Sequence, residues 1–145
     1  MIEVKILNKS SFDNPSYSTP QSSGVDLRAN IDAPIPIAPL ERVLIKTGLH
    51  LEIPEGYEAQ IRPRSGLALK KGLTVLNTPG TIDSDYRGEV GVILINLSST
   101  EVTVEPGERI CQMVFAPYEQ VQFMNTTSVE QTERGEGGFG HTGTY

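Results

Sequence analysis

The stretch LTVLNTPGTIDSDYRGEVGVILIN, residues 73–96, holds two apolar runs on either side of a polar segment. The runs cover 73–76 and 90–97, and the segment between them is rich in Gly, Asp and Tyr after a Pro-Gly step. Strand-forming residues on both sides of such a step predict a β-hairpin with a long, shaped connection. Asp83 and Tyr86 lie on that connection, where an acid and an aromatic ring could hold a cyclic ligand and activate a water. On this stretch alone, a solvated Asp-rich turn is the simpler interpretation.

Ten prolines and fourteen glycines are spread along the 145 residues, so most of them punctuate short strands. The chain is long enough for one domain with a real core. The best helix candidate is SGLALKK at 65–71, which Ser65 could cap and Gly72 could end. Glycines 80, 88 and 91 permit backbone geometry that bulky residues resist, and they allow close approach of another molecule. The sequence predicts an all-β fold. Besides the two strands of the hairpin, the expected strands cover 2–7, 25–29, 42–47, 49–53, 57–62, 101–104, 109–115 and 121–124. Prolines 34, 36 and 39 make a stiff connection between the strands at 25–29 and 42–47.

The formal net charge is −6, and the sequence pI is about 4.9. This balance argues against non-specific nucleic-acid binding, which needs a broad basic face, although a local Arg and Lys cluster could still hold a small polyanion. The single cysteine, Cys111, excludes an intrachain disulfide, and His50 and His141 leave no recognisable zinc pattern. Because no segment is apolar enough to span a membrane and no signal peptide is recognisable, we expect a soluble cytoplasmic protein.

From residue 125 onward the composition becomes polar and Gly-rich, and such a segment cannot bury enough apolar surface to fold alone. We therefore expect a β-domain at 1–124 and a flexible C-terminal arm at 125–145. The glycines at 135, 137 and 140 formally fit G-x-G-x-x-G, but a dinucleotide fold is rejected because no strand precedes them and no helix follows. The arm could close over a nucleotide, with an aromatic ring on the base and an arginine on a phosphate. A disordered tail is the alternative.

Three further stretches carry candidate chemistry. In SSGVDL, Asp26 follows a glycine at a strand start, where it could hold a hydrated metal or only form a turn. In RPRSGL, Arg64 precedes the predicted helix, where free N–H groups suit a phosphate; an ordinary N-cap with Arg64 in solvent explains it equally well. In GERICQ, strand alternation places Arg109 and Cys111 on one face and Gln112 on the other. A structural hydrogen bond is the simpler interpretation of Gln112, and Cys111 is most simply a small core residue.

Taken together, the stretches SGVDLRA, RPRSGLA, NTPGTIDSDYRGEV, GERICQMV and RGEGGFGHTG resemble, in order and spacing, the motifs of the trimeric dUTP diphosphatase (dUTPase) family. The resemblance runs from about residue 22 to residue 143. It implies a jelly-roll-like β-sandwich or distorted barrel with one short helix and a flexible C-terminal arm. It also implies a homotrimer whose three active sites lie at subunit contacts, where the arm of one chain covers a site formed by others.

The resemblance implies Mg²⁺-assisted hydrolysis of dUTP to dUMP and pyrophosphate by water attack on the α-phosphorus, which lowers dUTP and supplies dUMP for thymidylate synthesis. Asp83 matches the catalytic acid, Tyr86 the residue that excludes a 2′-hydroxyl, and Asp26 the acid that supports the metal through water. In the family, Mg²⁺ is held chiefly by phosphates and waters. The positions that match substrate-binding residues are Arg64, Ser65, Gly66, Asn77, Gly80, Thr81, Ile82, Asp83, Tyr86, Gly91, Gln112, Arg134, Phe139, Gly140, His141 and Thr142.

Two residues depart from the family pattern. His141 stands where many members have Ser, and Ser23 stands where Ala is common. Two other functions remain open: a dCTP deaminase-like enzyme of the same fold, which needs a different acid arrangement, and a non-catalytic nucleotide-sensing protein. The intact Asp83, with Tyr86 and the complete arm, argues against the deaminase, and the presence of Asp83 and Arg134 argues against the sensor. A purely structural β-sandwich leaves the matched motifs unexplained. The expected partners are dUTP and further copies of the same chain, without nucleic acid or membrane.

Overall fold

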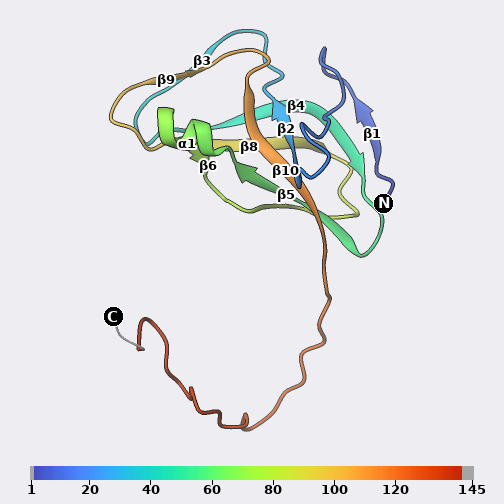
Figure 1. The fold of residues 1–145 in the computed structure, drawn as a ribbon, viewed down its shortest axis with the longest axis vertical. Helices are drawn as coiled ribbons and strands as arrows, with labels where there is room; N and C mark the ends of the chain where they lie inside the picture. The colour runs from blue at the N-terminus through green and yellow to red at the C-terminus, as the bar shows by residue number, and fades with distance from the viewer. Residues whose placement is uncertain (1, 142–145) are drawn as a thin grey trace.

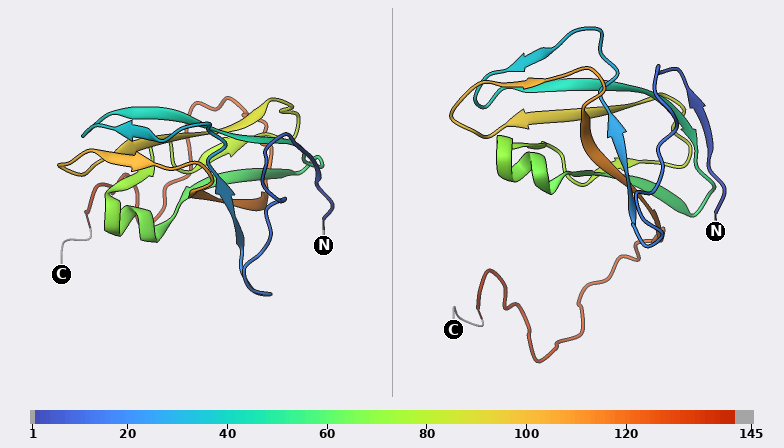
Figure 2. Two further views of the ribbon diagram at one scale, coloured as in Figure 1. Left: turned by 90° about the horizontal axis from the view of Figure 1, so that it is seen from above. Right: turned by 45° about the horizontal axis from the view of Figure 1, so that its top comes forward.

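The fold is a pair of four-stranded antiparallel sheets that pack against each other, as Figures 1 and 2 show. The structure is a computed structural model, and it describes residues 2–141. Sheet 1 has the strand order β1-β4-β8-β6, sheet 2 has the order β2-β10-β5-β7, and β3 and β9 form a small third sheet. The predicted all-β class is confirmed. The elements are β1 (Lys5–Asn8), β2 (Gly24–Arg28), β3 (Ile35–Ile37), β4 (Arg42–Glu52), β5 (Tyr57–Pro63), α1 (Ser65–Lys71), β6 (Leu73–Val75), β7 (Gly80–Ile82), β8 (Glu89–Asn96), β9 (Val102–Val104) and β10 (Arg109–Pro117).

The core lies between the two large sheets, because alternate residues of each strand point inward. Leu27 on β2, Ile45 on β4, Leu94 on β8 and Ile110 on β10 are all fully buried. The two strands predicted at 42–47 and 49–53 are one long strand, β4. Its register with β8 shifts between Lys46 and His50, so the strand bends there without ending.

The central stretch does more than form a hairpin. β6 and β8 pair antiparallel as predicted, but their connection contains β7, which pairs with β5 in the other sheet. The stretch therefore ties the two sheets together. None of its glycines 80, 88 and 91 has a positive φ, so they are not needed for a left-handed backbone. They instead allow neighbouring side chains to lie close to the backbone. A Cβ on Gly88 would collide with the Tyr86 ring, and one on Gly91 would lie 2.8 Å from a Leu44 methyl carbon.

Helix α1 covers the predicted residues 65–71, and it is the only helix in the described part of the chain. The N-cap is Arg64 with no side-chain cap bond, so the predicted Ser65 cap is wrong and Ser65 is the first helical residue. Gly72 ends the helix as predicted, with φ 64° and its N–H directed at the carbonyls of Ala68 and Leu67. Because the backbone of Gly72 is in the left-handed conformation, the chain turns there directly into β6.

Two predictions about the ends of the sheets are wrong. The proline-rich connection contains a short strand, β3, which pairs with β9. No strand forms at 121–124, where Phe123 is 91% exposed. The last strand pair of β10 is that of Pro117 with Tyr57 of β5, so the described residues beyond it have no neighbouring strand. The segment after β10 leaves the two sheets as an extended chain (Figure 1). The domain boundary between residues 124 and 125 stays a prediction. Nothing within 2–141 forms a helix of the length and apolar character that a bilayer span requires.

Candidate active site

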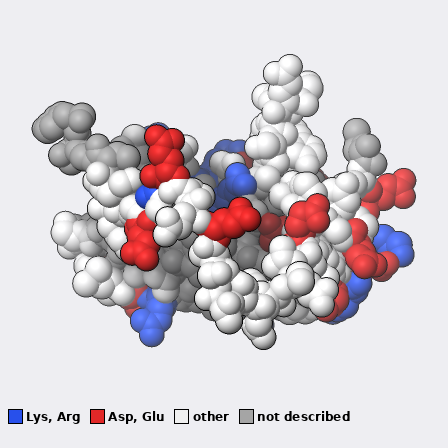
Figure 3. All heavy atoms as spheres, turned by 90° about the horizontal axis from the view of Figure 1, so that it is seen from below, with Lys and Arg blue, Asp and Glu red and all other residues white. Residues whose placement is uncertain are grey.

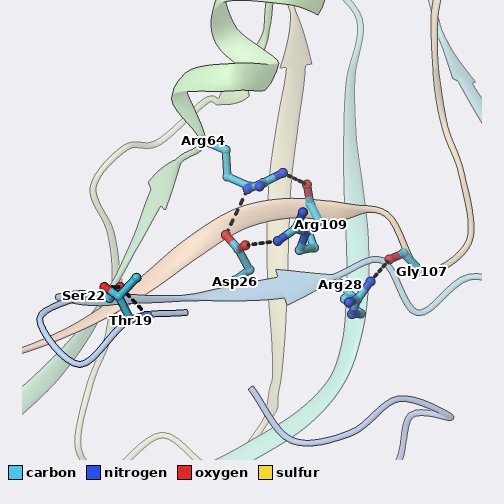
Figure 4. A network of polar contacts seen from close by, with 7 residues as sticks. All are labelled: Thr19, Ser22, Asp26, Arg28, Arg64, Gly107 and Arg109. Carbon is cyan, nitrogen blue, oxygen red and sulfur yellow. Dashed lines mark hydrogen bonds and ion pairs between the residues drawn. The ribbon is translucent and has the colours of Figure 1, made fainter. Parts of the chain in front are cut away.

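The first group of site residues lies on sheet 2, where three segments of the chain meet (Figure 4). Asp26 of β2 accepts a hydrogen bond from Arg64 Nε at 2.9 Å and another from Arg109 Nη1 at 3.1 Å, one on each carboxylate oxygen. Arg64 Nη1 also donates to the backbone oxygen of Arg109 at 3.0 Å. Asp26 and Arg64 are mostly shielded, with side chains 19% and 25% exposed. The predicted Asp26 and Arg64 are therefore direct neighbours.

Gln112 belongs to the same group, because it pairs with Asp26 on one side and Arg62 on the other. Its side chain is half-buried and makes no hydrogen bond within the described residues, contrary to the structural bond expected from the sequence. The amide oxygen lies over Gly24, where a Cβ would stand only 3.1 Å from it. Ser65 and Gly66, both exposed in the first turn of α1, complete the group beside Arg64. The side-chain amide of Gln112, which has no partner within the described residues, is available to a ligand.

A β-bulge in β10 overturns the predicted facing of Arg109. The register against β2 shifts between Arg109 and Cys111, so an extra residue, Ile110, interrupts the alternation. Ile110 and Cys111 are both buried, whereas Arg109 reaches Asp26 on the outer face. Arg109 is therefore a site neighbour that the sequence analysis placed on the wrong face.

Cys111 is a core residue, as the sequence analysis expected. It is 0% exposed. Burial above all, together with the negative charge of Asp26 and against the opposing charge of Arg64, raises the pKa of its thiol to about 12. A thiol held in its neutral form is not a nucleophile.

The second group lies on the turn between β7 and β8, which carries Asp83 and Tyr86. Asp83 is exposed at the end of β7, and its backbone oxygen accepts a hydrogen bond from the Tyr86 N–H at 3.2 Å. The Tyr86 hydroxyl donates to the backbone oxygen of Glu89 at 3.0 Å. Arg87 Nη1 donates to the backbone oxygens of Ser84 and Tyr86 at 2.7 and 3.0 Å. These bonds hold the acid and the ring in a fixed relation.

The sequence analysis missed two residues that brace this turn, Arg87 and His50. His50 Nδ1 lies 3.1 Å from the backbone oxygen of Arg87 and so links β4 to the turn. The His50 contact has no local sequence signal, because His50 is far from the turn along the chain. A basic residue within an acidic turn, DSDYRG, was the one available hint for Arg87.

A groove of about 690 Å³ surrounds Asp83, and its lining is acidic. One basic residue, Arg87, contributes to it alongside Glu55, Glu58 and Asp85. Acidic and basic side chains are interspersed on the face in Figure 3. Carboxylates so close to Asp83 would repel a triphosphate unless cations from elsewhere were brought to it.

The predicted base-binding residues accompany this turn. Gly80 is buried over Ile61, and a Cβ there would lie 3.3 Å from the amide nitrogen of Asn77. Asn77 and Thr81 are exposed, and Ile82 is half-buried. Gly91 is placed on β8 beside Leu44.

The third group lies on the arm. Arg134 Nε donates to the backbone oxygen of Gly137 at 2.9 Å, which forms a small turn. Phe139 is fully exposed with φ 48°, and Gly140 has φ 86°. The His141 ring lies so close to Gly137 that a Cβ on this glycine would collide with it. Thr142 lies outside the described residues.

One chain does not bring the three groups together. Ile82 at the end of β7 pairs with Ala59 of β5, whereas Arg64 follows the opposite end of β5. Arg64 is five residues beyond Ala59, which corresponds to roughly 17 Å along an extended strand. No hydrogen bond or ion pair within residues 2–141 links the turn, the Asp26 group and the arm.

Comparison with known proteins shows the family. A family model described as dUTPase matches residues 10–143. The deoxyuridine 5'-triphosphate nucleotidohydrolase of Aquifex aeolicus is 68% identical over 130 residues, which cover 90% of this chain and 87% of that relative. The protein of the same name from Fusobacterium nucleatum subsp. nucleatum is 54% identical over 142 residues, or 98% of this chain and 97% of the relative.

Solved structures show the same fold. The dUTPase of Staphylococcus bacteriophage 80alpha, in complex with dUpNHpp, matches with a TM-score of 0.85 at 24% identity. The match covers 99% of this chain and 100% of that one, so the whole jelly-roll-like arrangement is shared. By its sequence and its fold, this chain belongs to the dUTPase family.

Proposed function

We propose that the chain hydrolyses dUTP to dUMP and pyrophosphate, with Asp83 as the base that activates the attacking water. The observation that carries this assignment is the braced turn, which presents an exposed carboxylate three residues before an aromatic ring. The substrate follows from the relatives named deoxyuridine 5'-triphosphate nucleotidohydrolase, which match most of this chain. The reaction lowers dUTP and yields dUMP, the precursor that thymidylate synthesis consumes.

Asp83 is assigned to the water that attacks the α-phosphorus, and Tyr86 is assigned to the sugar. An exposed carboxylate on a fixed turn can accept a proton from a water within hydrogen-bond reach. The Tyr86 ring is held over Gly88 by the bond from its hydroxyl to Glu89. A ring fixed in this position would pack on a deoxyribose and leave no room for a 2′-hydroxyl, so the enzyme would select dUTP over UTP.

Uracil recognition is assigned to the hairpin backbone with Asn77 and Gly91. A fixed backbone presents a donor and acceptor pattern that suits uracil and leaves polar groups unpaired against cytosine. Gly80, Thr81 and Ile82 form the wall beside it as strand β7. The narrow hairpin would also exclude the thymine methyl group.

The triphosphate is assigned to Arg64, Ser65, Gly66 and Gln112. Arg64 uses Nε and one N–H of Nη1 for Asp26 and Arg109, which leaves further N–H donors for phosphate oxygens. Gln112 has an amide without a partner among the described residues. From the arm, Arg134, Gly140, His141 and Thr142 are assigned to the terminal phosphates, and Phe139 to stacking on uracil.

Asp26 fits the water-mediated Mg²⁺ role that the family implies. Its two oxygens each accept one N–H, so the carboxylate keeps lone pairs for a metal-bound water but is not free to enclose an ion. The residues described here contain no cluster of three or more metal-binding side chains, which suits an ion held mainly by phosphates and water. When bound, Mg²⁺ neutralises charge on the phosphates and the leaving pyrophosphate.

A homotrimer with shared sites is the arrangement that we propose, for three reasons. The proposed base Asp83, the residues around Asp26 and Arg64, and the arm lie apart in one chain, and Asp83 stands in an acidic groove. The outer face of sheet 1 carries an apolar strip between Arg42 and Lys46, since Leu44 and Leu76 are 61% and 45% exposed beside Ile93 and Ile95. The exposed apolar residues at 121–124 likewise lack cover within residues 2–141. Contacts between copies would bury these surfaces and complete each site.

The decisive experiment measures pyrophosphate release from dUTP with Mg²⁺, for the intact protein and for Asp83→Asn, with dCTP and UTP as control substrates. We expect rapid release from dUTP alone and a loss of at least about a hundredfold in the variant. Unchanged release in Asp83→Asn would refute the assignment of the base. Ammonia release from dCTP would identify a deaminase, and tight binding without any release would identify a nucleotide sensor.

A further inference from the structure

Arg109 contacts both Asp26 and Arg64, although the sequence analysis assigned no role to it. Its Nη1 bonds to Asp26 Oδ2 at 3.1 Å, and its backbone oxygen accepts a bond from Arg64 Nη1 at 3.0 Å (Figure 4). Arg64 Nε completes the circuit with Asp26 Oδ1 at 2.9 Å. Three segments that are distant in sequence thus form a closed ring of contacts.

The ring fixes the orientation of both partners. A guanidinium held at Nε and at Nη1 cannot rotate about its last bonds without losing both contacts, so the remaining N–H groups of Arg64 keep one direction. The Asp26 carboxylate is likewise held from both sides. Groups that are already oriented before a ligand arrives lose less entropy when they bind it.

Arg109 also determines the net charge of the cluster formed by Asp26, Arg64 and Arg109. Two guanidinium ions around one carboxylate leave one net positive charge, whereas Arg64 and Asp26 alone would neutralise each other. A triphosphate with its metal is drawn to the positive group and not to the neutral pair. The β-bulge that turns Arg109 outward is therefore a functional feature of β10.

We propose that Arg109 is a positioning residue for the metal–triphosphate part of the substrate, acting through Asp26 and Arg64. The inference rests on the proposed dUTP hydrolysis and deepens it. Arg109 itself, half-exposed at 48% of its side chain, has no assigned contact with the reacting atoms. Its loss is expected to weaken the interaction that depends on Mg²⁺ and the terminal phosphates, while uracil and sugar recognition remain.

The test is calorimetric binding of α,β-imido-dUTP and of dUMP to Arg109→Met, with and without Mg²⁺. We expect affinity for the imido nucleotide with Mg²⁺ to fall about tenfold or more, as for other residues that support a metal site from outside. Affinity for dUMP, which lacks the terminal phosphates, is expected to change by less than about twofold. Arg109→Lys keeps the charge but not the planar fork, so it should recover part of the loss.

Arg28→Met is the matched control. Arg28 lies directly opposite Arg109 on β2, is exposed, and donates to the backbone oxygen of Gly107 without touching Asp26 within the described residues. The variant removes the same charge from the same face and is expected to bind the imido nucleotide within about twofold of wild type. A loss equal to that of Arg109→Met would reduce the effect to general charge and overturn the inference.

Two other results would also overturn it. One is wild-type affinity and Mg²⁺ dependence in Arg109→Met; the other is an equal loss of dUMP and imido-dUTP binding with a lowered melting temperature, which indicates a structural role. If the methionine variant does not fold, Arg109→Gln, which keeps a polar side chain without charge, takes its place. A wild type that neither binds imido-dUTP nor releases pyrophosphate from dUTP overturns the proposed function and this inference together.

Discussion

Single residues at the candidate site are positioned by steric fit as well as by charge. Tyr86 lies over Gly88, the Gln112 amide lies over Gly24, and the His141 ring lies against Gly137. In each pair a glycine faces a predicted substrate-binding side chain. The glycines provide the space in which these side chains reach their positions.

Gly88→Ala is expected to loosen sugar selection. The added methyl group would displace the Tyr86 ring and stretch its bond to the Glu89 oxygen, because a Cβ at Gly88 collides with that ring. A displacement of about 1 Å near a reacting centre costs roughly tenfold to a hundredfold in rate. We expect kcat/KM for dUTP to fall by that amount and the preference for dUTP over UTP to shrink. An unaltered ratio of the two substrates would contradict the role of the ring.

Cys111 is expected to be inert in the folded protein. With its pKa raised to about 12 by burial, the thiol carries almost no thiolate near neutral pH, and no reagent reaches it. Because this is the only cysteine, all alkylation by iodoacetamide reports on one residue. Mass spectrometry should show negligible labelling at pH 8 in buffer and complete labelling in denaturant. Rapid labelling of the native protein would mean that β10 opens.

At the scale of elements, two features place the site residues: the turn between β7 and β8, and the end of α1. The turn is held by Arg87 and by His50 from β4, so Asp83, the proposed base, is anchored to both large sheets. Helix α1 starts directly after Arg64 and ends at Gly72, whose position is fixed by close contact with Ser98. Helix α1 is thus held at both ends, at its start by the bonds of Arg64 to Asp26 and to the Arg109 carbonyl, and at its end by Gly72.

Gly72→Ala is expected to destabilise the protein by about 2 kcal/mol, since a left-handed alanine costs roughly 1–2 kcal/mol. Its Cβ would also lie 2.9 Å from the Ser98 backbone nitrogen. Gly56→Ala is the matched control, because Gly56 also has a positive φ, 85°, but open space around it. Urea unfolding at one fixed protein concentration should show a larger loss for Gly72→Ala. Equal losses would mean that the Ser98 contact is absorbed without strain.

At the scale of the whole molecule, the chain presents the parts of the proposed active site in three separate places. The acidic groove around Asp83 and the positive group around Asp26 lie toward opposite ends of β5. The arm runs away from the two sheets as an extended segment (Figure 2). Such a division makes activity a property of the assembly and not of the single chain, if the proposed trimer is correct.

Mixing two inactive variants tests this arrangement. Asp83→Asn and Arg64→Met, refolded together, should recover activity because some sites combine an intact Asp83 from one chain with an intact Arg64 from another. For random trimers, about a quarter of the sites contain both intact residues. The same variants, refolded separately and then assayed as a mixture without exchange, serve as the control. Recovery that stays at the background of the single variants would place both residues of each site in one chain.

The sequence by itself determined the local features. Alternating apolar residues and evenly spread Gly and Pro predicted an all-β chain, SGLALKK predicted α1, and Gly72 predicted its end. The motif order was enough to identify the family resemblance, which the comparisons confirmed. These features depend on neighbours within a few residues, so they can be recognised along the chain.

Only the tertiary structure decided the features that depend on pairing. The crossing of β7 to sheet 2, the contact of Arg109 with Asp26 and the brace from His50 each join segments far apart in sequence. A single bulge at Ile110 reversed the facing of Arg109, because strand alternation has a period of two and one extra residue inverts it. The physical reason for the division is that turns and helix ends are fixed by local backbone preferences, whereas strand register is fixed by packing across the core.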